Sequence, residues 1–276
     1  MLHTTARARE KILVYGDWGS GKSYARNRLI GALRASGSDA KVFVIDTDDT
    51  RDRALDAYGD GFLEHVEWAY VNAWEDWLEA AERFAAKIGP DDWLVIDRID
   101  LAWAAAQDYY VRRVFGVDSA EFFLQFAADL EANPRFSKDG NRITEGSPLA
   151  GAHGQRWDHI KRTYAQFVSN ALFPRTTVKE RTWGHPGHVL ACAGEKDVNR
   201  EKDDAQTVSA YGGFGKKPAG EKNLPSQFHS VLWLSGVPGD WRYSTGRERE
   251  GREYVRGAGM GDFVLTYLVG VAGWEF

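Results

Sequence analysis

The sequence has very little cysteine and no long apolar segment. Its 276 residues contain a single cysteine, Cys192, which excludes an internal disulfide and a zinc site built on several cysteines. No apolar run approaches the roughly 20 residues that span a bilayer. Residues 1–10 are polar and basic and lack the apolar core of a signal peptide. We therefore expect a cytoplasmic protein that is neither secreted nor bound to a membrane.

An excess of basic charge is also missing. The chain carries 35 Lys and Arg residues against 40 Asp and Glu residues, for a formal net charge of −5. This balance argues against a protein whose whole surface grips nucleic acid. It leaves room for a local basic channel, because charges interact over only about 8–10 Å at physiological salt.

What the sequence does contain is an alternation of apolar strands and helical segments. A chain of this length can bury one sizeable core, so we expect one domain over residues 1–276. The alternation predicts an α/β fold in which helices flank a mostly parallel central sheet. Buried strands are predicted at residues 11–15, 41–46, 93–97 and 188–193, with helices at about 22–35, 73–88, 104–133 and 156–172. Strands near 230–234 and 241–244 predict a C-terminal β-hairpin or meander.

Two polar segments interrupt this alternation. Residues 134–154 are rich in glycine and predict an exposed loop. Residues 199–223 are charged, so we expect a long mobile loop there. The glycines of this second segment are Gly212, Gly213, Gly215 and Gly220.

A glycine-rich segment follows the first predicted strand. It matches the P-loop pattern G-x-x-x-x-G-K-[ST] and consists of Gly16, Asp17, Trp18, Gly19, Ser20, Gly21, Lys22 and Ser23. In this pattern backbone N–H groups and a helix N-terminus converge on phosphate oxygens. Lys22 is expected to reach the β- and γ-phosphates, and the Ser23 hydroxyl to ligate Mg²⁺. A chance glycine turn is the alternative, but the position between a strand and a helix favours binding of ATP with Mg²⁺.

Asp97 ends the third predicted strand. A carboxylate at that place is expected to hold the Mg²⁺ shell from the side opposite Ser23. The alternative is an aspartate that only caps the next turn. The following residue is Arg98, so a pair of adjacent acids is absent here.

Three acidic residues at the end of the second predicted strand are candidates for the catalytic base. Hydrolysis of ATP needs a carboxylate near the γ-phosphate that orients water, and Asp46, Asp48 and Asp49 offer one. We expect their strand to lie beside the P-loop strand or beside its neighbour. A solvated acidic turn is the alternative. At the end of the fourth strand, Glu195 or Lys196 is a candidate γ-phosphate sensor, or else part of a surface ion pair.

Cationic residues gather in two segments near the C-terminus. The first segment alternates with glutamates and is either a solvated hairpin or an arginine finger for a neighbouring subunit; its arginines are Arg242, Arg247, Arg249, Arg252 and Arg256. The second mixes cations with aromatic rings, which suits single-stranded nucleic acid, although a plain flexible loop explains it equally. Its residues are Lys216, Lys217, Lys222, Tyr211 and Phe214.

The order of these elements resembles the RecA-like ATPases of bacteriophages, the small AAA-type proteins of the single-strand-annealing recombination group. The quoted segments are the P-loop, residues 44–48, 94–97, 188–196 and 220–225, and the helix of Trp157. The resemblance implies a RecA-like core and a homo-oligomeric ring or filament with ATP at subunit boundaries. It also implies that single-stranded DNA is bound along a channel, in phage recombination or replication in the host cytoplasm.

The sequence departs from this family at three places. Asp48 stands where the family has a catalytic glutamate, and the shorter acid implies slow hydrolysis. Gly194 stands where a polar γ-phosphate sensor is usual. Residues 104–154 resemble an insertion relative to compact members.

Two other functions remain open from the sequence. One is a small-molecule or nucleotide kinase that uses the arginines of residues 247–256 as a lid. The other is a nucleotide-dependent assembly or packaging protein, in which ATP binding matters more than turnover. Stimulation by single-stranded DNA, phosphate transfer to an acceptor, or assembly without turnover distinguishes these possibilities from one another.

Overall fold

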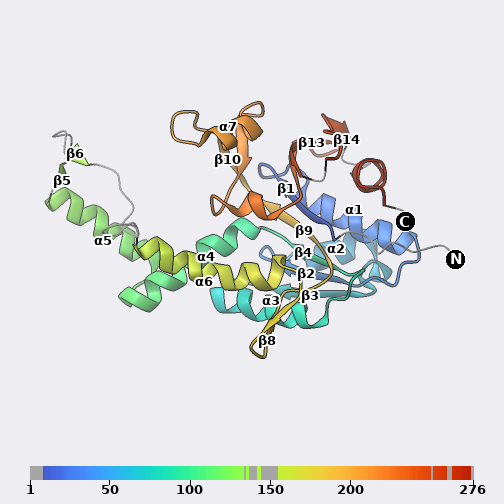
Figure 1. Cartoon of the computed structure of the whole chain (residues 1–276), viewed down its shortest axis with the longest axis horizontal. Coiled ribbons are helices and arrows are strands. Elements are labelled where there is room, and N and C mark those ends of the chain that lie inside the picture. Colours follow the sequence, from blue (N-terminus) through green and yellow to red (C-terminus); the bar gives the residue numbers. More distant parts are fainter. Residues whose placement is uncertain are drawn as a thin grey trace.

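The fold is α/β, with a central sheet of eight strands flanked by helices (Figure 1). The computed structural model describes residues 9–133, 135–136, 142–143, 155–249, 251–259 and 263–274. The strand order is β14-β13-β12-β1-β9-β4-β2-β3. These strands are β1 Lys11–Tyr15, β2 Val42–Asp46, β3 Val66–Tyr70, β4 Trp93–Ile96, β9 His188–Ala193, β12 Ser230–Val237, β13 Asp240–Glu248 and β14 Ala258–Gly259.

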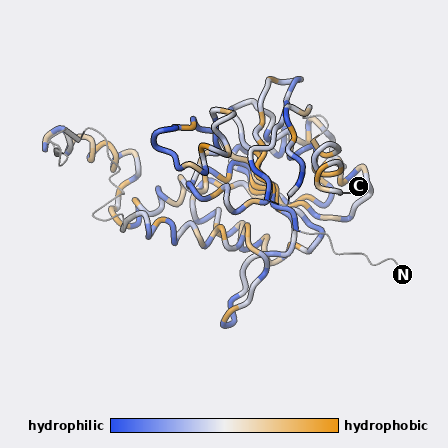
Figure 2. The backbone as a smooth tube through the Cα atoms, turned by 45° about the horizontal axis from the view of Figure 1, so that its top comes forward, coloured by the Kyte–Doolittle hydropathy of each residue, from blue (hydrophilic) through white to orange (hydrophobic). Residues whose placement is uncertain are grey.

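The six strands from β12 to β3 run parallel, and β12, β13 and β14 form an antiparallel edge. Strands β1, β2, β4 and β9 are almost completely buried, as expected for parallel strands covered on both faces. Figure 2 shows the hydrophobic segments gathered in these central strands. The predicted mostly parallel sheet and the C-terminal hairpin are therefore confirmed.

Helices cover both faces of the sheet. The helices of the described residues are α1 Lys22–Ala35, α2 Arg51–Tyr58, α3 Trp74–Lys87, α4 Ile99–Phe115, α5 Ser119–Ala132, α6 Gln155–Leu172 and α7 Ala205–Tyr211. Shorter or irregular turns are η1 Asp60–Leu63, η3 Leu224–Gln227 and η5 Phe263–Val269. Along β1, Leu13 and Tyr15 belong to the core under α3, α4 and α6, whereas Ile12 and Val14 belong to the core under α1 and η5. This alternation follows from the two-residue period of a strand.

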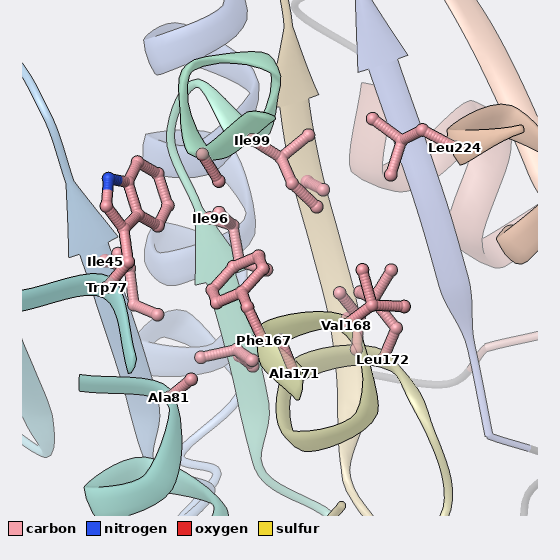
Figure 3. Packing of buried hydrophobic residues seen from close by; sticks show 14 of the residues in the cluster. Ile45, Trp77, Ala81, Ile96, Ile99, Phe167, Val168, Ala171, Leu172 and Leu224 are labelled. Carbon is pink, nitrogen blue, oxygen red and sulfur yellow. The ribbon is translucent and has the colours of Figure 1, made fainter. Parts of the chain in front are cut away.

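Aromatic packing holds α3 and α6 against the sheet. The rings of Trp77 and Phe167 meet edge to face at 5.3 Å, and both residues are 1% exposed or less. Figure 3 shows these side chains beside Ile45 and Ile96 of the strands below. Edge-to-face contact adds to the burial of apolar area, which explains why the tryptophan face of α3 turns inward.

The position of β2 differs from the expected one. Both β9 and β4 lie between β1 and β2, so the acidic residues at the end of β2 are not on a strand adjacent to β1 or to its neighbour. The order of parallel strands is set by where each crossover helix packs, which the local pattern does not encode. Strand β3 and helix α2 were also not anticipated.

The segment 199–223 also differs from the expected loop. It contains α7 and the strand β11 Lys216–Pro218, which pairs with β10 Glu195–Asp197 in an antiparallel ladder. Asp204 caps α7 by accepting a hydrogen bond from Thr207 N at 2.8 Å. The glycines suggested a loop because they mark turns, but they lie between these short elements.

The helical stretch expected at 104–133 is divided into α4 and α5 by Gly116, whose φ of 74° ends α4. Helix α5 extends away from the sheet in Figure 1. Most of the loop expected at 134–154, and residues 1–8, lie outside the described residues. No helix in the described part of the chain combines the length and hydropathy that crossing a bilayer requires.

Candidate nucleotide site

The glycine turn, residues 16–23, connects β1 to α1 at the carboxyl edge of the parallel strands. A Cβ on Gly16 would lie 2.5 Å from Leu234 O, and Gly21 has a φ of 94°. Both positions therefore require glycine. Gly21 is the N-cap of α1, and no side chain caps this helix. The first N–H groups of α1 are left to an external acceptor, an arrangement that favours an anion.

Lys22 folds back over the glycine turn. Its Nζ donates to Gly16 O at 3.0 Å and to Asp17 O at 2.7 Å. The side chain is largely buried, and this burial lowers the pKa of Lys22 while the nearby charge of Arg98 lowers it further. The ammonium group thus lies among carbonyl oxygens beside the N-terminus of α1, where it can exchange those acceptors for the oxygens of a phosphate.

Ser23 and Asp97, the two residues expected to hold Mg²⁺, are in direct contact. Ser23 Oγ donates to Asp97 Oδ2 at 3.1 Å, and Asp97 follows β4, two strands away from β1. Burial raises the pKa of Asp97, and the neighbouring Asp46 and Asp48 carboxylates add to the rise, against the opposing charge of Arg26.

Arg26 is a member of the site that the sequence did not indicate. Its Nη1 donates to Asp97 Oδ2 at 3.0 Å and to Thr50 Oγ1 at 2.9 Å, and its guanidinium stacks 4.8 Å from the centre of the Trp68 ring. Arg26 is 1% exposed and Asp97 is 2% exposed, so this is a fully buried ion pair. A lone arginine on a predicted helix gives no signal of such a pair.

Asp46 is engaged as a structural acceptor. Its Oδ2 accepts hydrogen bonds from Thr50 N at 2.7 Å, from Thr50 Oγ1 at 2.8 Å and from Trp68 Nε1 at 3.0 Å, and its Oδ1 accepts from Asp48 N at 3.1 Å. Burial alone would raise the pKa of Asp46, but these hydrogen bonds hold it below its usual value. Asp46 therefore organises the turn before α2, and as a base candidate it is completely buried and already accepts four hydrogen bonds.

The other base candidates differ in their surroundings. Asp48 and Asp49 are exposed, and Asp48 is close enough to Asp97 and Arg98 to affect the pKa of both. Glu195 instead accepts a hydrogen bond from Trp233 Nε1 at 3.1 Å. Asp48 accepts a hydrogen bond from Thr47 Oγ1 at 3.3 Å and is otherwise open to solvent.

Arg98 fills the place beside Gly194. It has a left-handed backbone with φ 72° and ψ 54°, a conformation rare for residues with a side chain. Asp100 accepts hydrogen bonds from Arg98 Nε at 3.2 Å and Nη2 at 3.0 Å, and its Oδ1 also accepts from Gly194 N at 3.1 Å. A Cβ on Gly194 would lie 3.2 Å from the guanidinium. Arg98, on the turn after β4, thus places a cation beside Gly194. In the family that the sequence resembles, a polar γ-phosphate sensor is usual at the position of Gly194.

Trp241 of β13 lies against the glycine turn. Its Nε1 donates to Gly19 O at 2.8 Å, and its ring packs on Tyr24 with centroids 4.6 Å apart. Trp18 is 93% exposed and points away from the core. The C-terminal hairpin therefore fixes the shape of a turn that is more than 200 residues earlier in the chain.

The predicted cations of the C-terminal segments are partly paired within the chain. The lysines bind nearby acids: Lys216 pairs with Asp197 and Glu195, Lys217 with Asp203, and Lys222 with Asp204. Arg242 pairs with Asp240, and Arg252 forms a two-point ion pair with the buried Glu10. Lys196 donates to Gly220 O at 3.3 Å. Arg252 is thus engaged and unavailable as a finger.

Comparison with known proteins adds no family to these observations. No protein-family model matches the chain, and no curated protein matches it. The functional argument consequently depends on the geometry of the glycine turn and of the residues around it.

The site has the donors and acceptors that a phosphate group and Mg²⁺ need. The glycine turn offers uncapped N–H groups and one ammonium group for an anion. Ser23 and Asp97 together offer a hydroxyl and a carboxylate, and Mg²⁺ is commonly held by one or two protein carboxylates with waters and substrate phosphates. Within the described ranges no cluster of three or more His, Cys, Asp or Glu residues forms a separate metal site.

Replacing Arg26 with alanine is expected to destabilise the fold strongly. The change leaves the Asp97 carboxylate buried without its partner, which costs about 3–5 kcal/mol of unfolding free energy, measured by chemical denaturation. Arg51→Ala, at an exposed pair with Asp52, is the control and should change stability by less than about 0.5 kcal/mol. A loss for Arg26→Ala as small as that of the control would contradict the buried ion pair.

Proposed function

We propose that this protein is a P-loop ATPase of RecA-like type that binds ATP with Mg²⁺, hydrolyses it slowly, and acts on single-stranded DNA. The observation that carries the proposal is the contact between Ser23 Oγ and Asp97 Oδ2 at 3.1 Å. It joins the end of the glycine turn to the acidic end of another parallel strand, as magnesium binding beside a phosphate loop requires.

Each residue of the site has a role in this proposal. The N–H groups of the glycine turn and of α1 bind phosphate oxygens, and Lys22 turns from the carbonyls of Gly16 and Asp17 to the β- and γ-phosphates. Ser23 and Asp97 would hold Mg²⁺, which would neutralise charge developing on the phosphates. Asp48 accepts the proton of the attacking water.

The resemblance in element order supports the partners of this protein in the proposal. In that view the protein assembles into a ring or filament of identical subunits in the host cytoplasm, in phage recombination or replication. Three arginines make no ion pair with another described residue: Arg247, Arg249 and Arg256. An arginine finger or a nucleic-acid contact requires guanidinium groups that are unpaired in this way.

A kinase is a weaker candidate because its lid is misplaced. Arg247 lies six residues beyond Trp241 along β13, which is about 20 Å at the rise of a strand. Trp241 contacts the glycine turn, so Arg247 and the following Arg249 lie toward the far end of the strand. An assembly protein with negligible turnover remains as an outcome of the test below.

Steady-state ATP hydrolysis, measured with and without single-stranded DNA, tests the proposal. We expect turnover that rises several-fold with DNA. Lys22→Ala should weaken ATP binding by roughly ten- to a hundredfold, because hydrogen bonds from a charged donor are lost. Unchanged nucleotide affinity in Lys22→Ala would refute the P-loop assignment. ATP-dependent assembly without turnover would instead favour the assembly protein.

Asp48→Asn is expected to remove hydrolysis and to spare ATP binding. The amide cannot accept the proton of water, so turnover should fall by about a hundredfold or more. Asp49→Asn, the adjacent exposed acid, is the matched control and should hydrolyse ATP normally. Normal turnover in Asp48→Asn would transfer the role of base to Asp49 or Glu195.

Arg98→Gln is expected to weaken ATP binding about tenfold and to leave ADP binding nearly unchanged, because a cation facing the terminal phosphate has no such partner in ADP. Isothermal titration with both nucleotides measures the difference. Arg51→Gln changes an exposed arginine that has no role in the proposal, and it controls for a general loss of positive charge. An equal effect on both nucleotides would show that Arg98 only supports the turn after β4.

A further inference from the structure

A polar cleft lies between α7, η3 and the end of β13, and it is separate from the glycine turn. Its volume is about 550 Å³. Charged and polar side chains line most of it, in contrast to the mainly apolar lining of pockets for small organic ligands. The lining residues that matter here are Tyr211, Lys222, Arg247, Arg249, Tyr254 and Arg256; we name this site the arginine cleft.

Three guanidinium groups of the arginine cleft are free of ion pairs within the described part of the chain. They belong to Arg247, Arg249 and Arg256, of which Arg256 stacks 4.9 Å from the centre of the Phe214 ring. The two acids of the cleft are engaged by residues other than these arginines: Asp204 pairs with Lys222 of the cleft, and Glu248 accepts a hydrogen bond from Tyr267 at 2.9 Å. The cleft therefore keeps a local positive charge in a protein of net charge −5.

A buried phenol adds an independent sign of a ligand. Tyr211 is 4% exposed and lines the cleft, and its hydroxyl has no hydrogen-bond partner among the described residues. Burial raises the pKa of Tyr211 to about 12, although Arg247 and Arg249 oppose the rise. The hydroxyl is thus a protonated donor close to two guanidinium groups. A buried donor of this kind is normally paired, and a phosphate oxygen would pair with it.

The arrangement suits a chain of phosphates better than a single anion. Arg247 lies near the end of β13 and Arg249 directly follows the strand, and two residues of extended chain separate their Cα atoms by about 7 Å. Arg256 approaches from a later segment, so the charges are spread along the cleft. Guanidinium groups bind phosphate through two parallel hydrogen bonds. Tyr254, 51% exposed, adds a ring on which an unpaired base can stack.

We infer that the arginine cleft binds the phosphate backbone of a single-stranded nucleic acid. The inference rests on the proposed action on nucleic acid and gives it a location. It also connects the two sites, because β13 carries Trp241 against the glycine turn at one end and Arg247 in the cleft at the other.

Binding of a labelled oligothymidine, followed by fluorescence anisotropy over a series of salt concentrations, tests the inference on the full chain. Arg247→Gln/Arg249→Gln should weaken binding about tenfold or more. It should also reduce the slope of log K against log salt by about 1.4, since each phosphate contact on a single strand contributes about 0.7. Arg242→Gln, on the same strand but outside the cleft, is the matched control and should bind as the unmodified protein does.

Tyr254→Ala separates stacking from charge. It should weaken binding without changing the salt slope, because the ring makes no phosphate contact. Equal affinity for a duplex of the same length would overturn the assignment to a single strand. Unchanged affinity and slope in Arg247→Gln/Arg249→Gln would overturn the cleft itself.

ATP affinity measured on the same variants distinguishes the two proposals. The cleft variants should bind ATP like the unmodified protein, and Lys22→Ala should not. Strand binding that depends on Arg247 and Arg249 in a protein that does not bind ATP would support the cleft and overturn the ATPase. Normal ATP hydrolysis, together with strand binding that does not depend on these arginines, would support the ATPase and overturn the cleft.

Discussion

The buried ion pair between Arg26 and Asp97 holds the candidate site together. Arg26 lies on α1 and Asp97 on the turn after β4, so the pair fixes the helix that follows the glycine turn to a strand two places away in the sheet. Removing two charges from water is costly, and only close geometry and further hydrogen bonds offset that cost. Ser23 and Thr50 supply those hydrogen bonds, so contacts within the chain hold one side of the site.

Around this pair, the carboxyl edge of the sheet is arranged so that most charges are already compensated. Asp46 is satisfied by Thr50 and Trp68, and Asp100 is satisfied by Arg98 and Gly194. The groups that are not held by an ion pair are the N–H groups at the start of α1, the Lys22 ammonium, which donates to the carbonyls of Gly16 and Asp17, and the exposed Asp48 carboxylate. An anion, a cation beside it and a water molecule would use these three, and the compensated residues would hold them in position.

The C-terminal hairpin gives the molecule a physical connection between two ends of the sheet. Strand β13 pairs with β12 from Asp240 to Glu248, with a bulge between Thr245 and Arg247. Trp241 of this strand constrains the glycine turn, and Arg247 contributes to the arginine cleft.

The sequence by itself determined the local features whose cause is local. The apolar runs specified four of the buried strands, the glycine pattern specified the turn between β1 and α1, and Asp97 was identified because it ends such a run. The sequence did not determine what depends on contacts between distant segments. These features join residues that are far apart in the chain or on different elements. They are the strand order that separates β2 from β1, the Arg26 pair, the engagement of Asp46, the placement of Arg98 beside Gly194 and the contact of Trp241 with Gly19. Burial and crossover packing, which act only in the folded chain, decided them.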